Sequence, residues 1–181
     1  MSNTKDLGKI RNLILDFFKT KKMINSLNSI HELEIKGWEK WWQVELAIYL
    51  GHSEDVSEWD MEHRFDIDQR TIQSKKYVML DLGFRLKKHR KEDWYFLELK
   101  QHNDYRQCFN RMCKDIDLVY STRKKSAHGI TTRYLVCAGI FLREDEDKVI
   151  KYAKNKLDRL GFDDDGLFLK NLGAYHQLLI F

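Results

Sequence analysis

The spacing of apolar residues changes along the chain, and each spacing predicts a different element. Helical spacing predicts amphipathic helices over four segments: 5–22, 38–50, 103–120 and 145–160. Alternation of apolar and polar residues predicts three strands: 59–67, 77–86 and 93–100. Two more uniformly apolar segments predict further strands: 132–142 and 174–181. Asn25, Ser26, Asn28 and Ser29 suggest a polar connector after the first helix.

This order of elements predicts an α/β fold with a mixed central sheet flanked by helices. The chain has no repeats, no low-complexity segment and no glycine- or proline-rich linker, so we expect one domain over residues 1–181. Gly51 and Gly161 follow predicted helices and are suitable C-terminal caps.

Composition narrows the class of protein. The 43% hydrophobic content is typical of a folded globular protein. No run of about 18 apolar residues is present, and the N-terminus lacks the apolar core of a signal peptide, so we expect no membrane span. Cys108, Cys113 and Cys137 show no paired metal-ligand spacing and suit buried or free thiols in a reducing cytosol. We therefore expect a cytoplasmic protein.

The predicted helix over 38–50 carries a carboxylate in an apolar face. Its stripe consists of five apolar residues: Trp38, Trp41, Trp42, Leu46 and Tyr49. Glu45 falls in the middle of that stripe. Burying an unpaired carboxylate costs several kcal/mol. Either Glu45 has a metal, a lysine or the water shell of a metal as its partner, or the prediction of this helix is wrong.

Two further carboxylates are expected on neighbouring strands. If strands 77–86 and 93–100 form a hairpin about a loop at 87–92, paired residue numbers sum to 179 or 180. Asp81 then lies opposite residue 98 or 99 and within reach of Glu98. Gly83, expected on the same face as Asp81, would leave room for an ion or a backbone segment.

The chemistry of these acids suggests a metal. Two close carboxylates repel each other unless a cation or a shared proton intervenes, and Mg²⁺ prefers such oxygen ligands. Lys100 shares the face of Glu98 and could hold or deprotonate a water, or stabilise charge on a phosphate. The alternative is an internal salt-bridge network formed by Asp81, Glu98 and Lys100.

Basic residues gather in two places and are candidates for phosphate contact. The first cluster lies in the hairpin loop: Lys87, Lys88, Arg90 and Lys91. The second cluster follows the third predicted helix: Arg123, Lys124 and Lys125. Either cluster taken alone could equally be a solvated turn.

Residues 38–142 resemble the PD-(D/E)XK nuclease superfamily, whose restriction endonuclease-like core has the order αβββαβ. The likeness rests on Glu45 in the helix, Asp81 in VMLDLG and the triplet Glu98-Leu99-Lys100, in that order. Leu80 stands where the family often has proline. Gln101 and Tyr105 could be an analogue of a Q-x-x-x-Y element that some exonuclease-like members carry. An N-terminal helix and a C-terminal helix and strand lie outside the matched core.

The resemblance implies a divalent-metal-dependent nuclease that hydrolyses phosphodiester bonds, with DNA favoured over RNA. Asp81, Glu98 and the backbone carbonyl of Leu99 would bind Mg²⁺ or Mn²⁺. Lys100 would position the attacking water, and Glu45 would hold a metal-bound water or a second metal. The two basic clusters would contact phosphates. A homodimer or a partner subunit would supply targeting.

One rival function is a catalytically inactive domain of this fold that binds nucleic acid or a partner protein, since fold does not fix function. Other chemistries are less favoured, because their motifs are missing. The sequence has no GxxxxGK[ST] phosphate loop, no GxSxG elbow, no HExxH and no paired CxxC.

Overall fold

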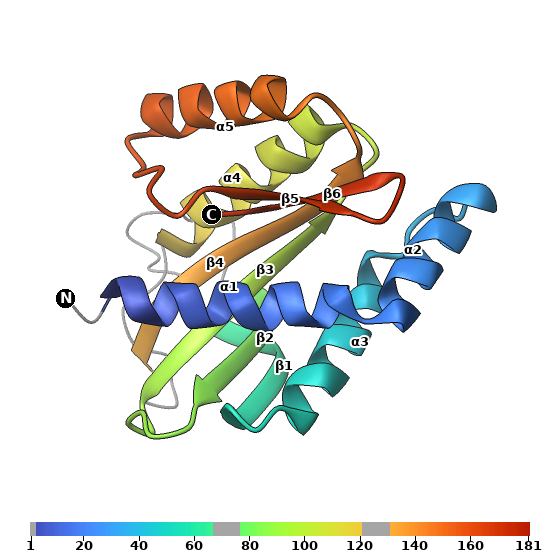
Figure 1. Cartoon of the computed structure of the whole chain (residues 1–181). Helices are drawn as coiled ribbons and strands as arrows, with labels where there is room; N and C mark the ends of the chain where they lie inside the picture. The colour runs from blue at the N-terminus through green and yellow to red at the C-terminus, as the bar shows by residue number, and fades with distance from the viewer. Residues whose placement is uncertain (1–2, 67–76, 121–130) are drawn as a thin grey trace. The chain divides into compact units, whose positions relative to one another are not determined.

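The structure is a computed structural model that describes residues 3–66, 77–120 and 131–181 (Figure 1). Its helices are α1 (Asn3–Lys19), α2 (Lys21–Glu32), α3 (Glu39–His52), α4 (Tyr105–Tyr120) and α5 (Glu146–Leu160). Its strands are β1 (Val56–Asp66), β2 (Tyr77–Leu86), β3 (Asp93–Gln101), β4 (Thr131–Leu142), β5 (Phe168–Leu172) and β6 (His176–Ile180). They form one sheet in the order β1-β2-β3-β4-β6-β5. The predicted α/β class, a central sheet flanked by helices, is confirmed.

Contacts between residues divide the chain into two compact units. The first unit comprises Met1–Lys40, Lys100–Arg111 and Ala138–Phe181. The second unit comprises Trp41–Leu99 and Met112–Cys137. Four elements, α3, β3, α4 and β4, contribute residues to both units. The expectation of one domain stays a prediction, and each unit is described separately below.

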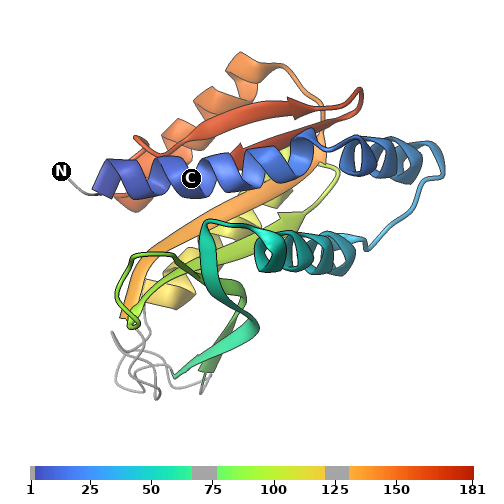
Figure 2. The same ribbon diagram turned by 60° about the horizontal axis from the view of Figure 1, so that its bottom comes forward.

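In the first unit, helices cover both faces of an antiparallel hairpin formed by β5 and β6. The register runs from Phe168 opposite Ile180 to Leu172 opposite His176, and β6 also pairs with the end of β4. Helices α1 and α5 lie on either side of this hairpin (Figures 1 and 2). The guanidinium of Arg11 in α1 lies 4.9 Å from the ring centroid of Phe168. The buried residues of α5 recur at helical spacing and form its packing face: Val149, Ala153 and Leu157.

Two elements of the first unit were not predicted. The expected polar connector is helix α2, because Met23, Leu27 and Ile30 form a buried stripe between the polar residues. The hydroxyl of Thr20 caps this helix by accepting a hydrogen bond from the amide of Met23 at 3.3 Å. Strand β5 was also missed, since it has only five residues and ends at a tight turn where Gly173 has φ of 60°.

In the second unit, β1, β2 and β3 form an antiparallel meander, as predicted. One face of this meander carries a cluster of buried residues: Phe65, Val78, Leu80, Trp94 and Phe96. Leu118 and Val119 of α4 and Leu135 of β4 pack against the cluster. These contacts fix which side chains of β2 and β3 face α4 and which face away from it.

The structure corrects the end of α3. The helix runs through Gly51 to His52 rather than ending at Gly51. A side chain at position 51 would meet the indole Nε1 of Trp59 at 2.7 Å. Glycine is therefore explained by the close approach of Trp59 and not by a C-terminal cap. Gly161, by contrast, does cap α5, with φ of 72° and a backbone amide bonded to the carbonyl of Asp158.

Cys108, Cys113 and Cys137 are buried free thiols, in agreement with the sequence. Among the helices that the structure describes, none combines the length and the apolar character needed to cross a bilayer.

His176 is a buried titratable group in the first unit, with 3% of its surface exposed. Its ring packs edge-on against Trp38 and His31, at centroid distances of 5.8 and 5.9 Å. Burial, and secondarily the charge of His31, lowers the pKa of His176 to about 4. The unfolded chain therefore takes up a proton near pH 6.5 that the folded chain resists until about pH 4.

We predict that this difference destabilises the protein in acid. The free energy of unfolding should fall as pH drops from about 6.5 to 4, and His176 should account for up to about 3 kcal/mol of that fall. Urea unfolding across this range should show that His176→Phe removes this part of the pH dependence. The same substitution at the exposed His52 should leave it in place. Equal pH profiles for the two variants would contradict the assignment.

Candidate functional site

The predicted hairpin register brings Asp81 to the Glu98-Leu99-Lys100 segment. Phe84 pairs with Tyr95 and Leu82 with Leu97, so paired numbers sum to 179, and the predicted register is confirmed. Immediately beyond Leu82, the Asp81 carboxylate accepts a hydrogen bond from the backbone amide of Leu99 at 2.7 Å. The carboxylate thus bonds the peptide that joins Glu98 to Leu99.

Gln43 of α3 fixes the same carboxylate from the helix. Its amide Nε2 donates to the backbone carbonyl of Asp81 at 2.8 Å and to Oδ1 of Asp81 at 3.3 Å. The Gln43 side chain is buried, with 3% of its surface exposed. An amide at this depth would cost about 1–3 kcal/mol without partners, so these bonds stabilise both its position and that of Asp81.

The pleat of β2 is irregular at Asp81. Leu80 belongs to the cluster around Trp94 and Phe96, and a Cβ on Gly83 would meet the same two rings. Residues three apart lie on opposite faces of a regular strand, so the alternation shifts by one residue between them. Opposite this shift in β1, Glu62 has φ of 57°.

The expected space at Gly83 is not present. A Cβ at this position would lie 2.6 Å from Cε1 of Phe96, so the aromatic ring fills the room that the sequence suggested for an ion. The glycine serves the packing of Phe96 rather than the carboxylate.

Glu98 and Lys100 lie in β3 on either side of Leu99, whose amide bonds to Asp81. Glu98 is buried, with 6% of its surface exposed, and follows Trp94 and Phe96 on the same face of the strand. Lys100 is half-buried and begins the short end of β3 that belongs to the first unit. The acid-x-lysine triplet is therefore held in a strand, with a buried acid and a half-buried lysine.

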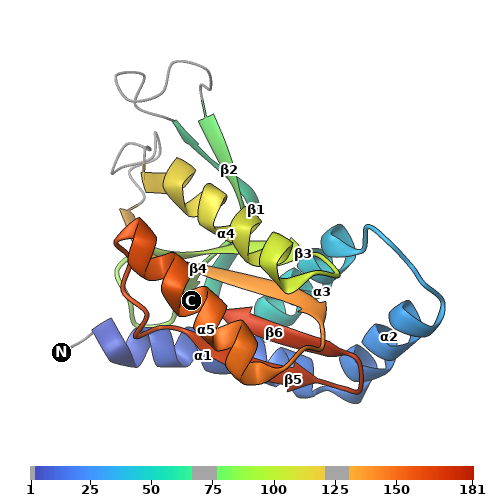
Figure 3. The same ribbon diagram turned by 90° about the horizontal axis from the view of Figure 1, so that it is seen from above.

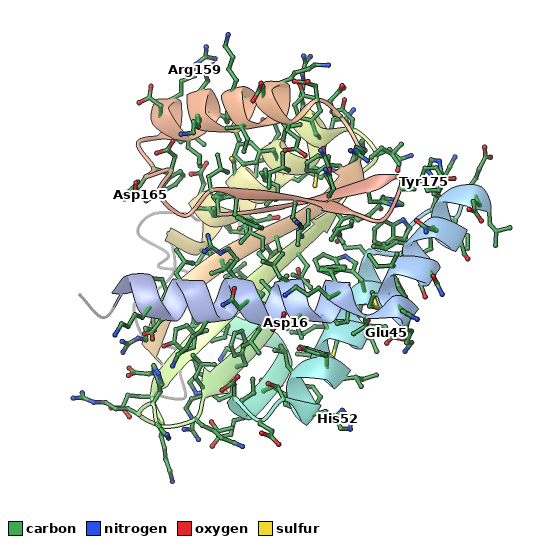
Figure 4. The ribbon with its side chains drawn as sticks, viewed as in Figure 1. Asp16, Glu45, His52, Arg159, Asp165 and Tyr175 are labelled. Atoms are coloured by element: carbon green, nitrogen blue, oxygen red, sulfur yellow. The ribbon has the colours of Figure 1, made fainter. Side chains whose placement is uncertain are left out.

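The polar residue in the buried face of α3 is Gln43, not Glu45. The buried residues of the helix are Trp42, Gln43, Leu46, Ala47 and Leu50. Glu45 (Figure 4) is half-buried and lies on the margin of this face, in line with the half-buried Trp41 and Tyr49. The predicted apolar stripe was centred on the tryptophans and is therefore rotated about the helix axis relative to the face that is buried in the structure. The metal-binding role of Glu45 stays a prediction.

A second acid of α3 contacts β3 within the first unit. Glu39, in the first turn of the helix, accepts a hydrogen bond from the backbone amide of Gln101 at 2.6 Å. Glu39, Gln43, Leu46 and Leu50 are spaced i, i+4, i+7 and i+11, which is one helical face. That spacing is the signal in the sequence that could have identified Glu39 and Gln43.

Gln101 and Tyr105 do not lie together on one helix. Gln101 ends β3, and its side-chain amide donates to Asn103 at 3.4 Å. Tyr105 begins α4, is buried, and packs against Phe141 and Tyr152. Both side chains have structural contacts of their own, and a catalytic role for the pair stays a prediction.

The basic hairpin loop is structured and exposes its cations. Lys87, Lys88, Arg90 and Lys91 are all exposed. Three hydrogen bonds order the loop: Arg85 Nη1 to the carbonyl of His89 at 3.2 Å, Trp94 Nε1 to the carbonyl of Lys91 at 3.0 Å, and the Tyr95 hydroxyl with Nδ1 of His89 at 2.9 Å. The other expected phosphate-binding cluster, Arg123, Lys124 and Lys125, lies outside the described residues.

The oxygen atoms around the Asp81–Leu99 hydrogen bond are suitable ligands for a hard divalent cation. The carboxylates of Asp81 and Glu98 and the carbonyl of Leu99 are oxygen donors of the kind that Mg²⁺ and Mn²⁺ bind. The Asp81 carboxylate is held in place by the hydrogen bonds from Gln43 and from the amide of Leu99.

A separate acidic group lies in the turn after α5. In the part of the chain that the structure describes, Asp163, Asp164 and Asp165 are the one group of three or more close histidine, cysteine or acidic ligands. Lys154 pairs with Asp164 at 2.9 Å. Exposed acidic turns are common without an ion, and we assign no metal to this one.

Comparisons with known proteins gave no relative: no family model matches the sequence, and no similar curated protein or solved structure was found.

The contacts of Gln43 lead to a stability prediction. Gln43→Met keeps the side-chain length but removes the donor, so the carbonyl and carboxylate of Asp81 each lose a hydrogen bond. We expect a decrease of about 1–3 kcal/mol in the free energy of unfolding, measured by urea denaturation. Val44→Met, at the neighbouring position that is 40% exposed, should change it by less than about 0.5 kcal/mol. Equal effects would show that the Gln43 bonds are not stabilising.

Proposed function

We propose that the protein is a divalent-metal-dependent nuclease of PD-(D/E)XK type that hydrolyses phosphodiester bonds, with DNA favoured over RNA. The observation that carries this proposal is the 2.7 Å hydrogen bond between the Asp81 carboxylate and the amide of Leu99. It joins the acid of one strand to the acid-x-lysine triplet of the next. The element order α3-β1-β2-β3-α4-β4 agrees with the αβββαβ restriction endonuclease-like core and supports the same proposal.

In this proposal each residue has a defined task. Asp81 and Glu98 hold Mg²⁺ or Mn²⁺ together with the carbonyl of Leu99, and Gln43 keeps the Asp81 carboxylate oriented. The metal, when bound, supplies Lewis acidity and a more acidic water. Lys100 positions the attacking water and stabilises charge on the phosphate. Glu45, half-buried on α3, holds a further water or a second metal.

The basic loop would bind the substrate away from the scissile bond. Lys87 is six residues from Asp81 along an extended strand, which is about 20 Å. Since a nucleic-acid strand rises about 3.4 Å per nucleotide, the loop would contact phosphates about six nucleotides from the cleaved bond. A substrate must therefore extend at least that far on one side, and a homodimer or partner subunit would add further targeting.

The decisive experiment compares metal-dependent cleavage by the wild type and three variants: Asp81→Asn, Glu98→Gln and Lys100→Met. Substrates are plasmid, linear and single-stranded DNA and RNA, with Mg²⁺, Mn²⁺ or EDTA. We expect cleavage by the wild type to require the metal and each variant to lose at least about 100-fold in rate. Glu54→Gln, in the exposed turn before β1, and Lys151→Met, at an exposed position of α5, should remain active.

Thermal melting should accompany these assays, so that loss of folding is not read as loss of catalysis. Cleavage that persists in EDTA, or that survives all three substitutions, would contradict the proposal. Binding of nucleic acid without cleavage of any substrate would instead favour the inactive binding domain.

Replacement of the four loop cations by glutamine should weaken DNA binding in a salt-dependent manner. Each lost phosphate contact should reduce the slope of log affinity against log salt by about 0.9, so the full set should reduce it by up to about 3.6. The measurement is fluorescence anisotropy in EDTA with the Lys100→Met background. Four exposed lysines of the first unit, replaced in the same way, provide a control of equal charge: Lys5, Lys9, Lys151 and Lys170. An equal change in slope for the control set would refute a specific role of the loop.

A further inference from the structure

The first unit contains a polar cavity between α4 and α5 that the nuclease proposal does not use. Its volume is about 290 Å³, near the lower limit of about 300 Å³ for small-ligand pockets. Helix α4 contributes Asn110 to its lining, and α5 contributes Tyr152, Asn155, Lys156 and Arg159. The two helices run side by side (Figure 3), and Tyr152 contacts Tyr105 and Phe109 of α4 at centroid distances of 5.5 and 6.2 Å.

The four lining residues of α5 form one stripe of that helix. Their spacing is i, i+3, i+4 and i+7, so they project from one side of α5. Asn155 and Arg159 are exposed and Tyr152 and Lys156 are half-buried, so the cavity that they line with Asn110 is open to solvent. Arg159 lies toward the end of α5 (Figure 4).

The lining carries positive charge and hydrogen-bond donors but no carboxylate. Among the residues that the structure describes, Lys156 and Arg159 form no ion pair. The Tyr152 hydroxyl donates to Oδ1 of Asn110 at 3.1 Å, which leaves the amide group of Asn110 as a donor. The Arg106 guanidinium adds positive charge nearby, since it lies 5.8 Å from the centroid of the Tyr152 ring.

We propose that this cavity binds a phosphate monoester. Two unpaired cations match its charge of about −1.5 to −2 at neutral pH better than the single charge of a phosphodiester. Arg159 offers a planar fork of donors, Lys156 a point charge, and the Asn110 and Asn155 amides neutral donors for the remaining oxygens. The small volume admits a phosphate and part of the group that carries it.

Isothermal titration calorimetry of the whole protein with inorganic phosphate and with AMP tests this site. The titrations contain EDTA and no substrate, so their outcome is independent of the nuclease proposal. The pocket variant is Lys156→Gln with Arg159→Gln, and the control, with the same change in charge, is Lys9→Gln with Lys151→Gln. We expect both ligands to bind the wild type and the control, and Kd to rise at least tenfold in the pocket variant.

Asn110→Asp provides a second test, because the new carboxylate still accepts the Tyr152 hydrogen bond but repels phosphate. It should also raise Kd at least tenfold. The proposal is overturned if millimolar phosphate and AMP fail to bind the wild type, or if the pocket and control variants lose affinity equally.

Competition against AMP identifies where the monoester comes from. Displacement by an oligonucleotide with a 5′-phosphate, but not by its 5′-hydroxyl counterpart, would support the end of a nucleic-acid strand as the source. Displacement by neither would support a free nucleotide or phosphate. Equal displacement by both would mean that the cavity binds phosphodiesters and would overturn the monoester assignment.

Discussion

The second unit depends on one carboxylate that takes the place of a backbone acceptor in a β-ladder. The amide of Leu99 donates to the side chain of Asp81, and Gln43 donates to the same residue from α3. Leu99 is fully buried and Gln43 nearly so, which means that neither donor has water as an alternative partner. A helix and two strands are therefore held together by an acid whose chemistry is also suited to a metal.

This arrangement explains why the pleat of β2 shifts at that point. With regular alternation, Asp81 would lie on the face opposite to Leu80, and Gly83 would lie on the same face as Asp81. The shift keeps Leu80 and Gly83 against Phe96 while Asp81 turns toward the Leu99 amide and α3. Leu80 and Gly83 thus both pack against Phe96, and Asp81, which lies between them in the sequence, accepts the bonds from Leu99 and Gln43.

The sequence predicts the strands and their register well, because a period of two and a six-residue loop leave few ways to pair β2 with β3. It predicts the face of α3 less well. The prediction centred the buried face of α3 on the tryptophans because they are large and apolar. In the structure Gln43 is buried instead, since it bonds to Asp81 of β2, and Glu45 lies at the margin of that face. Helix α2 was missed because its apolar stripe is short. Only three of its residues are buried, and the serines and asparagines between them hide the helical spacing in the sequence. The Asp81 bond to Leu99 depends on a break in periodicity, and periodic patterns cannot reveal such a break.

The division of the chain into two units has a practical consequence. The backbone passes from one unit to the other within four elements: α3, β3, α4 and β4. No contiguous fragment contains all of the second unit without also including Lys100–Arg111. Truncation is therefore a poor way to separate the acids of β2 and β3 from the cavity beside α5. Point substitutions, which leave the path of the chain intact, are the appropriate means of assigning a function to either unit.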